Sequence, residues 1–186
     1  HDRSTEHMEK YILENVKPVE LKRGRLSQKT EEATEFERAA FTTLVYQLNW
    51  VGKETRPEVC GVSSLLARRV KSPTVADNDL ANKAARMLRS SSGQRMTFWK
   101  TDPVTMVMVS FSDAAGQSVD MLKEHDDVDT IVEELCSQAA WMVVVSEPGL
   151  GDGRRVRASP VAWRSSRLKR VVISTLGGET QALGQA

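Results

Sequence analysis

The sequence predicts a mixed α/β protein in which a unit of three helices precedes a unit built around strands. Apolar residues recur every three or four positions between residues 34 and 89, which is typical of amphipathic helices. From about residue 103 the apolar residues form short, valine-rich runs, which are typical of strands. Residues 166–186 return to a helical pattern, so the second half is expected to follow the order strand, strand, strand, helix.

The first two helices are expected on either side of a glycine and a proline. The apolar stripe of the first helix extends from Phe36 to Val51, and Gly52 is expected to end it. The second helix opens at Arg56-Pro57, because the first helical turn tolerates a residue without an N–H.

The third helix is expected to begin at Val75 or Asp77 and to end near Arg89. A run of serines and a glycine follows it and favours a turn. Arg56 is expected to have a structural role at the preceding helix junction, by pairing with Glu58 or with a helix end.

Three strands and a closing helix are expected in the second half. The run 104–111, which leads to Asp113, predicts a strand buried on both faces. The runs 140–145 and 161–164 predict two more strands, and the glycine-rich stretch 148–153 between them predicts a turn. Residues 166–186 predict a helix.

Length and composition set broad limits. A chain of 186 residues with net charge +1 suits one or two ordinary globular domains rather than a polycationic tail. Cys60 and Cys136 show neither a disulfide framework nor a metal-ligand spacing, which favours a reducing compartment. No apolar run is long enough to cross a bilayer, and no signal-peptide pattern is found. The sequence therefore predicts an intracellular protein, in the cytoplasm or the nucleus.

Two oppositely charged stretches flank the second expected strand. The acidic stretch at about 118–136 is interpreted as a solvated helical insertion, and metal binding or mimicry of nucleic acid is the alternative. The basic stretch is able to neutralise phosphates. A solvated surface, or an ion pair with the acidic stretch, explains it equally well. Its residues are Arg154, Arg155, Arg157, Arg164, Arg167, Lys169 and Arg170.

Two carboxylates are candidates for a shared metal ion. Asp113 follows a predicted strand, and Glu179 lies in the first turns of the predicted closing helix. Taken alone, Asp113 also fits a strand-end turn and Glu179 an ordinary helix-surface acid. Other site chemistries are excluded, because the three histidines have no partner at a metal-ligand or triad spacing. The glycine-rich stretch is followed by a strand instead of a helix, so it is no dinucleotide fingerprint.

The order and spacing of several motifs resemble copia-type retrotransposon polyproteins. In the first half the similar segments are a helix, a Thr-Arg-Pro motif and a second helix, at 44–50, 55–59 and 81–89. In the second half they are Ser112-Asp113-Ala114, Ala162-Trp163-Arg164-Ser165 and residues 174–179. No single motif is decisive, but together they cover most of the chain apart from the acidic stretch.

The resemblance implies three regions. Residues 1–33 would be a polar connecting segment that follows the polymerase palm. Residues 34–98 would be a helical thumb- or connection-like region of a reverse transcriptase. Residues 103–186 would be a truncated ribonuclease H-like domain of mixed sheet and helix, which carries the acidic stretch as an insertion.

The resemblance also implies site residues and a cofactor. Asp113 and Glu179 would be the first two catalytic, metal-binding carboxylates of the ribonuclease H domain. Mg²⁺ would be the metal, because hard oxygen ligands suit it, and the complete enzyme would hydrolyse RNA with two metal ions.

The implied partners are an RNA–DNA hybrid or template–primer duplex and the remainder of the polyprotein, with no membrane. Lysine and arginine side chains bind phosphates irrespective of base sequence. For each candidate in the helical region, a solvated helix face is the alternative interpretation. The nucleic-acid-binding candidates are Arg68, Arg69, Lys83, Arg86, Arg89, Arg164 and Arg167.

The sequence also departs from the family pattern. It has no Tyr-x-Asp-Asp polymerase motif, and it ends before the further carboxylates of the nuclease would follow. A fragment that is inactive by itself is therefore expected. Gly177-Gly178 immediately precedes Glu179, where helix formers are expected, which suggests a decayed or divergent copy. The alternative function is a non-catalytic module that binds nucleic acid or protein.

Overall fold

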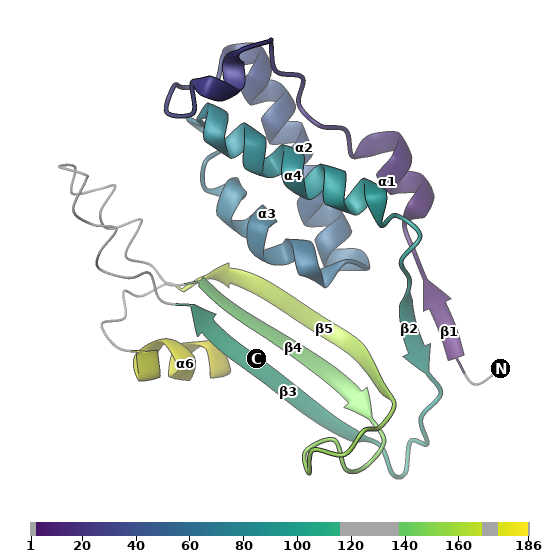
Figure 1. Ribbon diagram of the computed structural model, residues 1–186. Coiled ribbons are helices and arrows are strands. Elements are labelled where there is room, and N and C mark those ends of the chain that lie inside the picture. Colours follow the sequence, from purple (N-terminus) through teal and green to yellow (C-terminus); the bar gives the residue numbers. More distant parts are fainter. Residues whose placement is uncertain (1–2, 116–137, 169–174, 186) are drawn as a thin grey trace. The chain divides into compact units, whose positions relative to one another are not determined.

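The described part of the chain is a mixed α/β fold in two compact units (Figure 1). The computed structural model describes residues 3–115, 138–168 and 175–185, so the acidic stretch at 118–136 lies outside it. One unit, here the helical unit, is Thr5–Met96. The other, here the sheet unit, is Thr97–Ala186 together with His1–Ser4. The division falls a few residues before the change of sequence pattern expected at about residue 103.

The three predicted helices are present in the helical unit. The third begins at Val75, as predicted, and ends at Ser90. The first continues two residues past Gly52, and a short 3-10 turn with Pro57 in its first turn precedes the second. No described helix is both long and apolar enough to span a membrane. The helical elements of this unit are α1 (Glu9–Asn15), η1 (Arg25–Ser27), α2 (Glu35–Glu54), η2 (Pro57–Val59), α3 (Cys60–Ala67) and α4 (Val75–Ser90).

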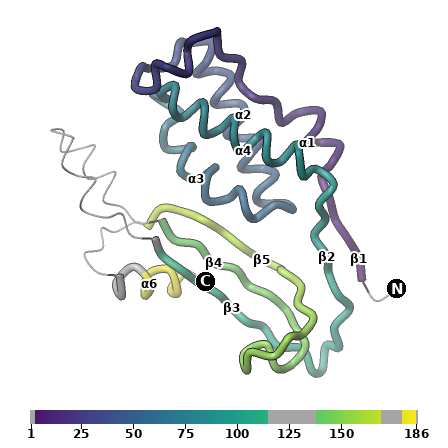
Figure 2. The backbone as a smooth tube through the Cα atoms, viewed as in Figure 1, coloured from purple at the N-terminus to yellow at the C-terminus, as the bar shows by residue number. Residues whose placement is uncertain are grey.

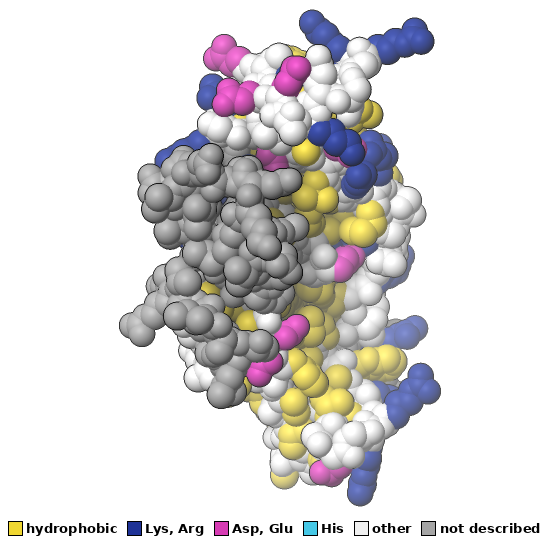
Figure 3. Space-filling model, turned by 60° about the vertical axis from the view of Figure 1, so that its left-hand side comes forward, with side chains coloured by type: hydrophobic (Ala, Val, Ile, Leu, Met, Phe, Trp, Pro, Cys, Tyr) yellow, Lys and Arg dark blue, Asp and Glu magenta, His cyan; other side chains and the backbone are white. Residues whose placement is uncertain are grey.

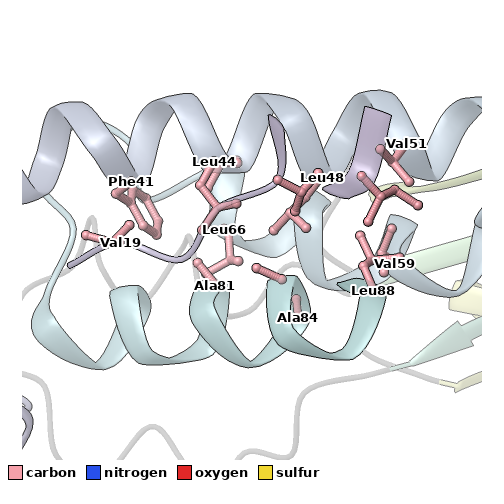
Figure 4. Packing of buried hydrophobic residues seen from close by; sticks show 14 residues of the cluster. Val19, Phe41, Leu44, Leu48, Val51, Val59, Leu66, Ala81, Ala84 and Leu88 are labelled. Carbon is pink, nitrogen blue, oxygen red and sulfur yellow. The ribbon is translucent and has the colours of Figure 1, made fainter. Parts of the chain in front are cut away.

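One hydrophobic core holds the helical unit together. Leu48 of α2, Leu66 of α3 and Leu88 of α4 are at most 1% exposed and belong to the same cluster (Figure 4). Each buried aliphatic side chain of this size contributes about 1.5–3 kcal/mol relative to an exposed one. The apolar stripes that predicted the helices are therefore the surfaces that join them.

The segment before α2 is more ordered than its polar composition predicted. Residues 1–33 were expected to form a connecting segment, but α1 lies within them. Ile12 and Val16 are fully buried and Val19 is 5% exposed, all in the core of the helical unit. Three apolar side chains, at spacings of four and three residues, are too few to give a helical pattern in a polar segment. They are nevertheless enough to pack this segment against the core of the helical unit.

A buried arginine–glutamate pair anchors the first turn of α2. Thr34 and Glu37 form a capping box, in which the Thr34 amide donates to Glu37 Oε2 at 2.8 Å. The guanidinium of Arg25 donates to both Glu37 oxygens, at 3.1 and 3.2 Å. The hydrogen bonds from Arg25 lower the pKa of Glu37, and the bonds from Thr34 act in the same direction against desolvation.

We expect Glu37→Gln to lower the free energy of unfolding by about 1 kcal/mol at neutral pH, the usual contribution of a charged cap. Because folding depresses this pKa, the stabilisation is complete above the ordinary value of 4.5 and is lost as the pH falls through the folded-state pKa. Urea unfolding at several pH values should therefore show the two proteins converging in acid. Glu31→Gln, at a half-exposed carboxylate, is the control. A constant gap at every pH would contradict the assignment.

The sheet unit is built on a three-stranded antiparallel sheet in the order β3-β4-β5 (Figure 2). A separate two-stranded sheet pairs β1 with β2. The predicted turn at 148–153 connects β4 to β5, and Gly149 and Gly153 have positive φ angles there. The elements are β1 (Arg3–Glu6), β2 (Met96–Trp99), β3 (Val107–Ala115), β4 (Gln138–Ser146), β5 (Ala158–Arg167) and α6 (Thr175–Leu183).

The prediction that the first strand of this sheet is buried on both faces was wrong. Met108 of β3 is 72% exposed and Phe111 is 50% exposed. The two residues are three positions apart in a strand that pairs regularly with β4, so they belong to opposite faces, and both faces of β3 are partly exposed. Continuous burial is a property of parallel sheets covered by helices on both sides. Figure 3 shows hydrophobic side chains gathered on the face of the sheet unit that it presents.

Candidate metal-binding carboxylates and nucleic-acid interface

Asp113 lies near the end of β3, where the sequence placed it, and its side chain is exposed. Its Oδ1 accepts a hydrogen bond of 2.9 Å from the Ala114 amide. Along the sheet Asp113 is opposite Ala140, which is opposite Ser165. Side chains in such a row share one face, so these three residues define the face to which the carboxylate belongs.

The neighbouring row of the sheet packs against α6. Ala139, which is opposite Ala114, forms a small buried cluster with Leu168 and with Ala182 of α6. The Ser166 hydroxyl of the same row donates to Gln185 Oε1 at 3.3 Å, just beyond the helix. Because successive side chains of a strand alternate, Asp113 belongs to the face opposite the one that α6 covers.

Glu179 lies on α6 and is exposed. It precedes the buried Ala182 by three residues, so it flanks the side of the helix that meets the sheet. Asp113 and Glu179 therefore occupy the two predicted elements but approach from different faces of the sheet. Among the residues that the structure describes, no three side chains of His, Cys, Asp or Glu are grouped to hold a metal. The described carboxylates do not by themselves fit a magnesium centre.

Lys83 and Arg86 are the two candidate cations that the structure brings together. They lie on one side of α4 and share the carboxylate of Asp79, at 2.9 Å from Lys83 Nζ and 3.8 Å from Arg86 Nη2. The hydrogen bond from Lys83 lowers the pKa of Asp79, and the charge of Arg86 adds to this effect. Both cationic side chains are more than half exposed. The group of Lys83, Arg86 and Asp79 therefore has a net charge of +1 and lies at the solvent-exposed surface.

Arg68 and Arg69 follow the end of α3. Arg68 is half-buried and Arg69 is exposed. Their amides donate to Leu65 O and Leu66 O and close the last turn of the helix.

Arg89 is engaged within the helical unit. Its Nη1 donates to three carbonyl oxygens at the end of α1, namely Leu13 at 2.8 Å, Val16 at 3.2 Å and Ile12 at 3.4 Å. A cation at the carbonyl end of a helix satisfies free acceptors and complements the helix dipole. A phosphate would have to compete with these bonds.

Arg164 and Arg167 lie on β5 but not on one face. Arg164 is opposite Trp141, and its side chain belongs to the same face of the sheet as Ala139, which packs against α6. Arg167 is three residues further and therefore belongs to the other face. The two candidates cannot act as a single patch on one side of the sheet.

One basic–aromatic cluster was missed by the sequence analysis. The guanidinium carbons of Arg3 and Arg157 lie 5.7 and 5.0 Å from the ring centre of Trp99. The three residues are far apart in the sequence, so no local pattern reveals the contact. The only signal was the basic run that contains Arg157.

Comparisons with family models, with curated proteins and with solved structures found no match for this chain. The functional assignment therefore depends on the motif resemblance and on the geometry described above.

Proposed function

We propose that the chain is part of a copia-type retrotransposon reverse transcriptase–ribonuclease H, and that it binds an RNA–DNA hybrid or template–primer duplex. The observation that carries the proposal is the order of elements after the helical unit. An antiparallel sheet β3-β4-β5 is followed by α6, which packs against β3 and β4. Asp113 is on the first of these strands and Glu179 is on the helix, as the resemblance implies.

The contribution of this chain to the proposed function is phosphate binding by the helical unit. Lys83 and Arg86 present two exposed cations about one helical turn apart and are only partly neutralised by Asp79. Phosphate oxygens are able to bind the two cations in place of the Asp79 carboxylate or beside it. Such contacts give binding that weakens with salt and does not depend on base sequence. Hydrolysis of the RNA strand with magnesium is assigned to the complete polyprotein only.

The alternative is a non-catalytic module that retained the fold and lost the chemistry. The orientation of Asp113 favours it, because this carboxylate belongs to the face opposite the row that packs against α6. The alternative module binds nucleic acid or protein, and hybrid binding is the property that the first of these shares with the nuclease, so binding is tested first.

We expect Lys83→Ala/Arg86→Ala to weaken hybrid binding and to flatten its salt dependence. Each lost phosphate contact reduces the slope of log K against log salt by about 0.9, so the double variant should lose about 2. Fluorescence anisotropy of a labelled RNA–DNA hybrid, titrated at several salt concentrations, measures both quantities. Arg23→Ala/Arg38→Ala removes the same charge from exposed positions and is the matched control. If both double variants lost the same affinity and the same salt slope, the loss would reflect net charge alone, and this result would contradict the assigned interface.

Asp113→Asn separates the two functions in the same titration. Hybrid binding that survives the substitution and needs no metal favours the non-catalytic module. Magnesium-dependent cleavage of the RNA strand that this substitution abolishes favours the nuclease. We expect binding without cleavage from this chain alone.

A further inference from the structure

Two arginines from distant parts of the sequence converge on one indole ring in the sheet unit. Arg3 comes from β1, and Arg157 comes from the segment immediately before β5. Their guanidinium carbons lie 5.7 and 5.0 Å from the ring centre of Trp99, within the range of cation–π contacts. Both arginines are exposed, and Trp99 is half-buried. The ring therefore gathers two positive charges at the surface.

Backbone contacts hold this cluster in place. The Trp99 amide donates to the hydroxyl of Ser159 at 2.8 Å, and Ser159 is only 5% exposed on β5. The Glu147 amide donates to the Arg157 carbonyl at 3.2 Å and closes the β4–β5 loop. The backbones of Trp99 and Arg157 are thus both held by hydrogen bonds to residues of the three-stranded sheet or of its connecting loop.

Among the described residues, the two arginines give the cluster a positive charge. Within the described residues, neither Arg3 nor Arg157 forms an ion pair with a carboxylate. Arg154 and Arg155 of the same loop are exposed and add two more charges. Like charges held close together repel, so a bound anion lowers the energy of the cluster. A guanidinium that stacks on a ring keeps its N–H edge available for phosphate oxygens.

We propose that Arg3 and Arg157, positioned by Trp99, bind phosphates of a nucleic-acid strand. A strand fits this cluster because it repeats one negative charge at every phosphate, and the loop supplies several cations in succession. This site adds phosphate binding by the sheet unit to the proposed function. It rests on the proposed function only for the identity of the partner. Of the three residues, Arg157 belongs to the basic stretch of the sequence, and Arg3 and Trp99 were not among the sequence-based candidates.

The test uses the full-length chain and a labelled RNA–DNA hybrid in the same anisotropy titration. Arg3→Ala/Arg157→Ala is expected to flatten the salt slope by about 2, one unit for each lost contact, whereas the charge-matched Arg23→Ala/Arg38→Ala is expected to retain it. An equal change in both double variants, or no change in the first, would overturn the site. Thermal unfolding of each variant confirms that it is folded.

Substitutions of Trp99 test the positioning role. Trp99→Leu removes the ring face and is expected to weaken hybrid binding about threefold, whereas Trp99→Phe keeps an aromatic face and is expected to stay closer to the unmodified chain. Identical affinities for both variants and the unmodified chain would overturn this role. If only Lys83→Ala/Arg86→Ala alters the slope, the proposed function stands without this site. If only Arg3→Ala/Arg157→Ala does so, this site stands and the helical interface fails.

Discussion

Replacing Arg56 with alanine is expected to lower the free energy of unfolding of the helical unit by about 3 kcal/mol, because it removes a buried guanidinium together with several hydrogen bonds. Arg56 is only 4% exposed. Its guanidinium pairs with Glu58 and donates to the Ser91 carbonyl at 3.0 Å, the Ser91 hydroxyl at 2.7 Å and Gln94 Oε1 at 2.9 Å. One side chain thus joins the α2–α3 junction to the end of α4.

The reason for this large effect is the set of acceptors that alanine would leave behind. The Ser91 carbonyl, at the C-cap of α4, also accepts from the Gln94 amide at 3.0 Å, so the acceptors that lose their donor are the Ser91 hydroxyl and Gln94 Oε1. A buried acceptor left without a donor costs about 1–3 kcal/mol. The sequence-based expectation that Arg56 pairs with Glu58 or with a helix end is confirmed on both counts.

Urea unfolding followed by far-UV circular dichroism measures the effect. Glu58→Gln is the control, because the side chain of Glu58 is 41% exposed and an exposed pair contributes less than about 1 kcal/mol. Arg56→Lys should recover less than half of the loss, since an ammonium group cannot reproduce the planar fork. If Arg56→Ala were as mild as Glu58→Gln, the network around Ser91 and Gln94 would have no energetic role.

The second large effect is expected for Asn82→Ala, at about 2–3 kcal/mol. The side-chain amide of Asn82 accepts a hydrogen bond of 2.6 Å from the Val19 amide and donates one of 2.9 Å to the Val19 carbonyl. Both residues are buried. Asn82 on α4 therefore binds the segment that follows α1 as a neighbouring strand would, and alanine leaves two buried backbone groups without partners.

Two measurements test the role of Asn82. Urea unfolding gives the loss of stability, and hydrogen exchange monitored by NMR reports on the Val19 amide directly. Protection of that amide should fall in Asn82→Ala further than the global loss of stability explains. Asn15→Ala, which removes an exposed hydrogen bond within α1, is the matched control and should cost less than about 0.5 kcal/mol. Unchanged protection at Val19 would contradict the bridge.

Local sequence patterns were sufficient to predict an element wherever its backbone hydrogen bonds are formed within the element itself. The third helix was predicted to begin at Val75 or Asp77 and to end near Arg89, and it extends from Val75 to Ser90, because its apolar residues repeat with the helical period and Thr74 caps it. The predicted turn at 148–153 likewise connects two strands, since glycine alone readily adopts the positive φ found at Gly149 and Gly153. In contrast, β5 extends well beyond the predicted 161–164, because its ends are held by pairing with β4 rather than by their own composition.

The candidate site shows the same limit. The sequence placed Asp113 on a strand and Glu179 on a helix, and the structure has both residues on such elements. It could not show which face each side chain joins, because that depends on the register of β3 against β4 and on the row that α6 covers. Of the proposed cations, Lys83 and Arg86 share the carboxylate of Asp79, and Arg89 instead caps α1.

The sequence by itself determined the mixed α/β class, the three helices of the first half and the presence of three strands in the second, whereas their antiparallel pairing came from the structure. These features follow from periodicity, capping and turn residues, which act over a few positions. Only the tertiary structure decided that Val19 joins the core through Asn82, that β3 is exposed on both faces, and that Arg3 and Arg157 meet at Trp99. Such contacts join residues tens of positions apart, and their energy depends on packing and register that no local pattern encodes.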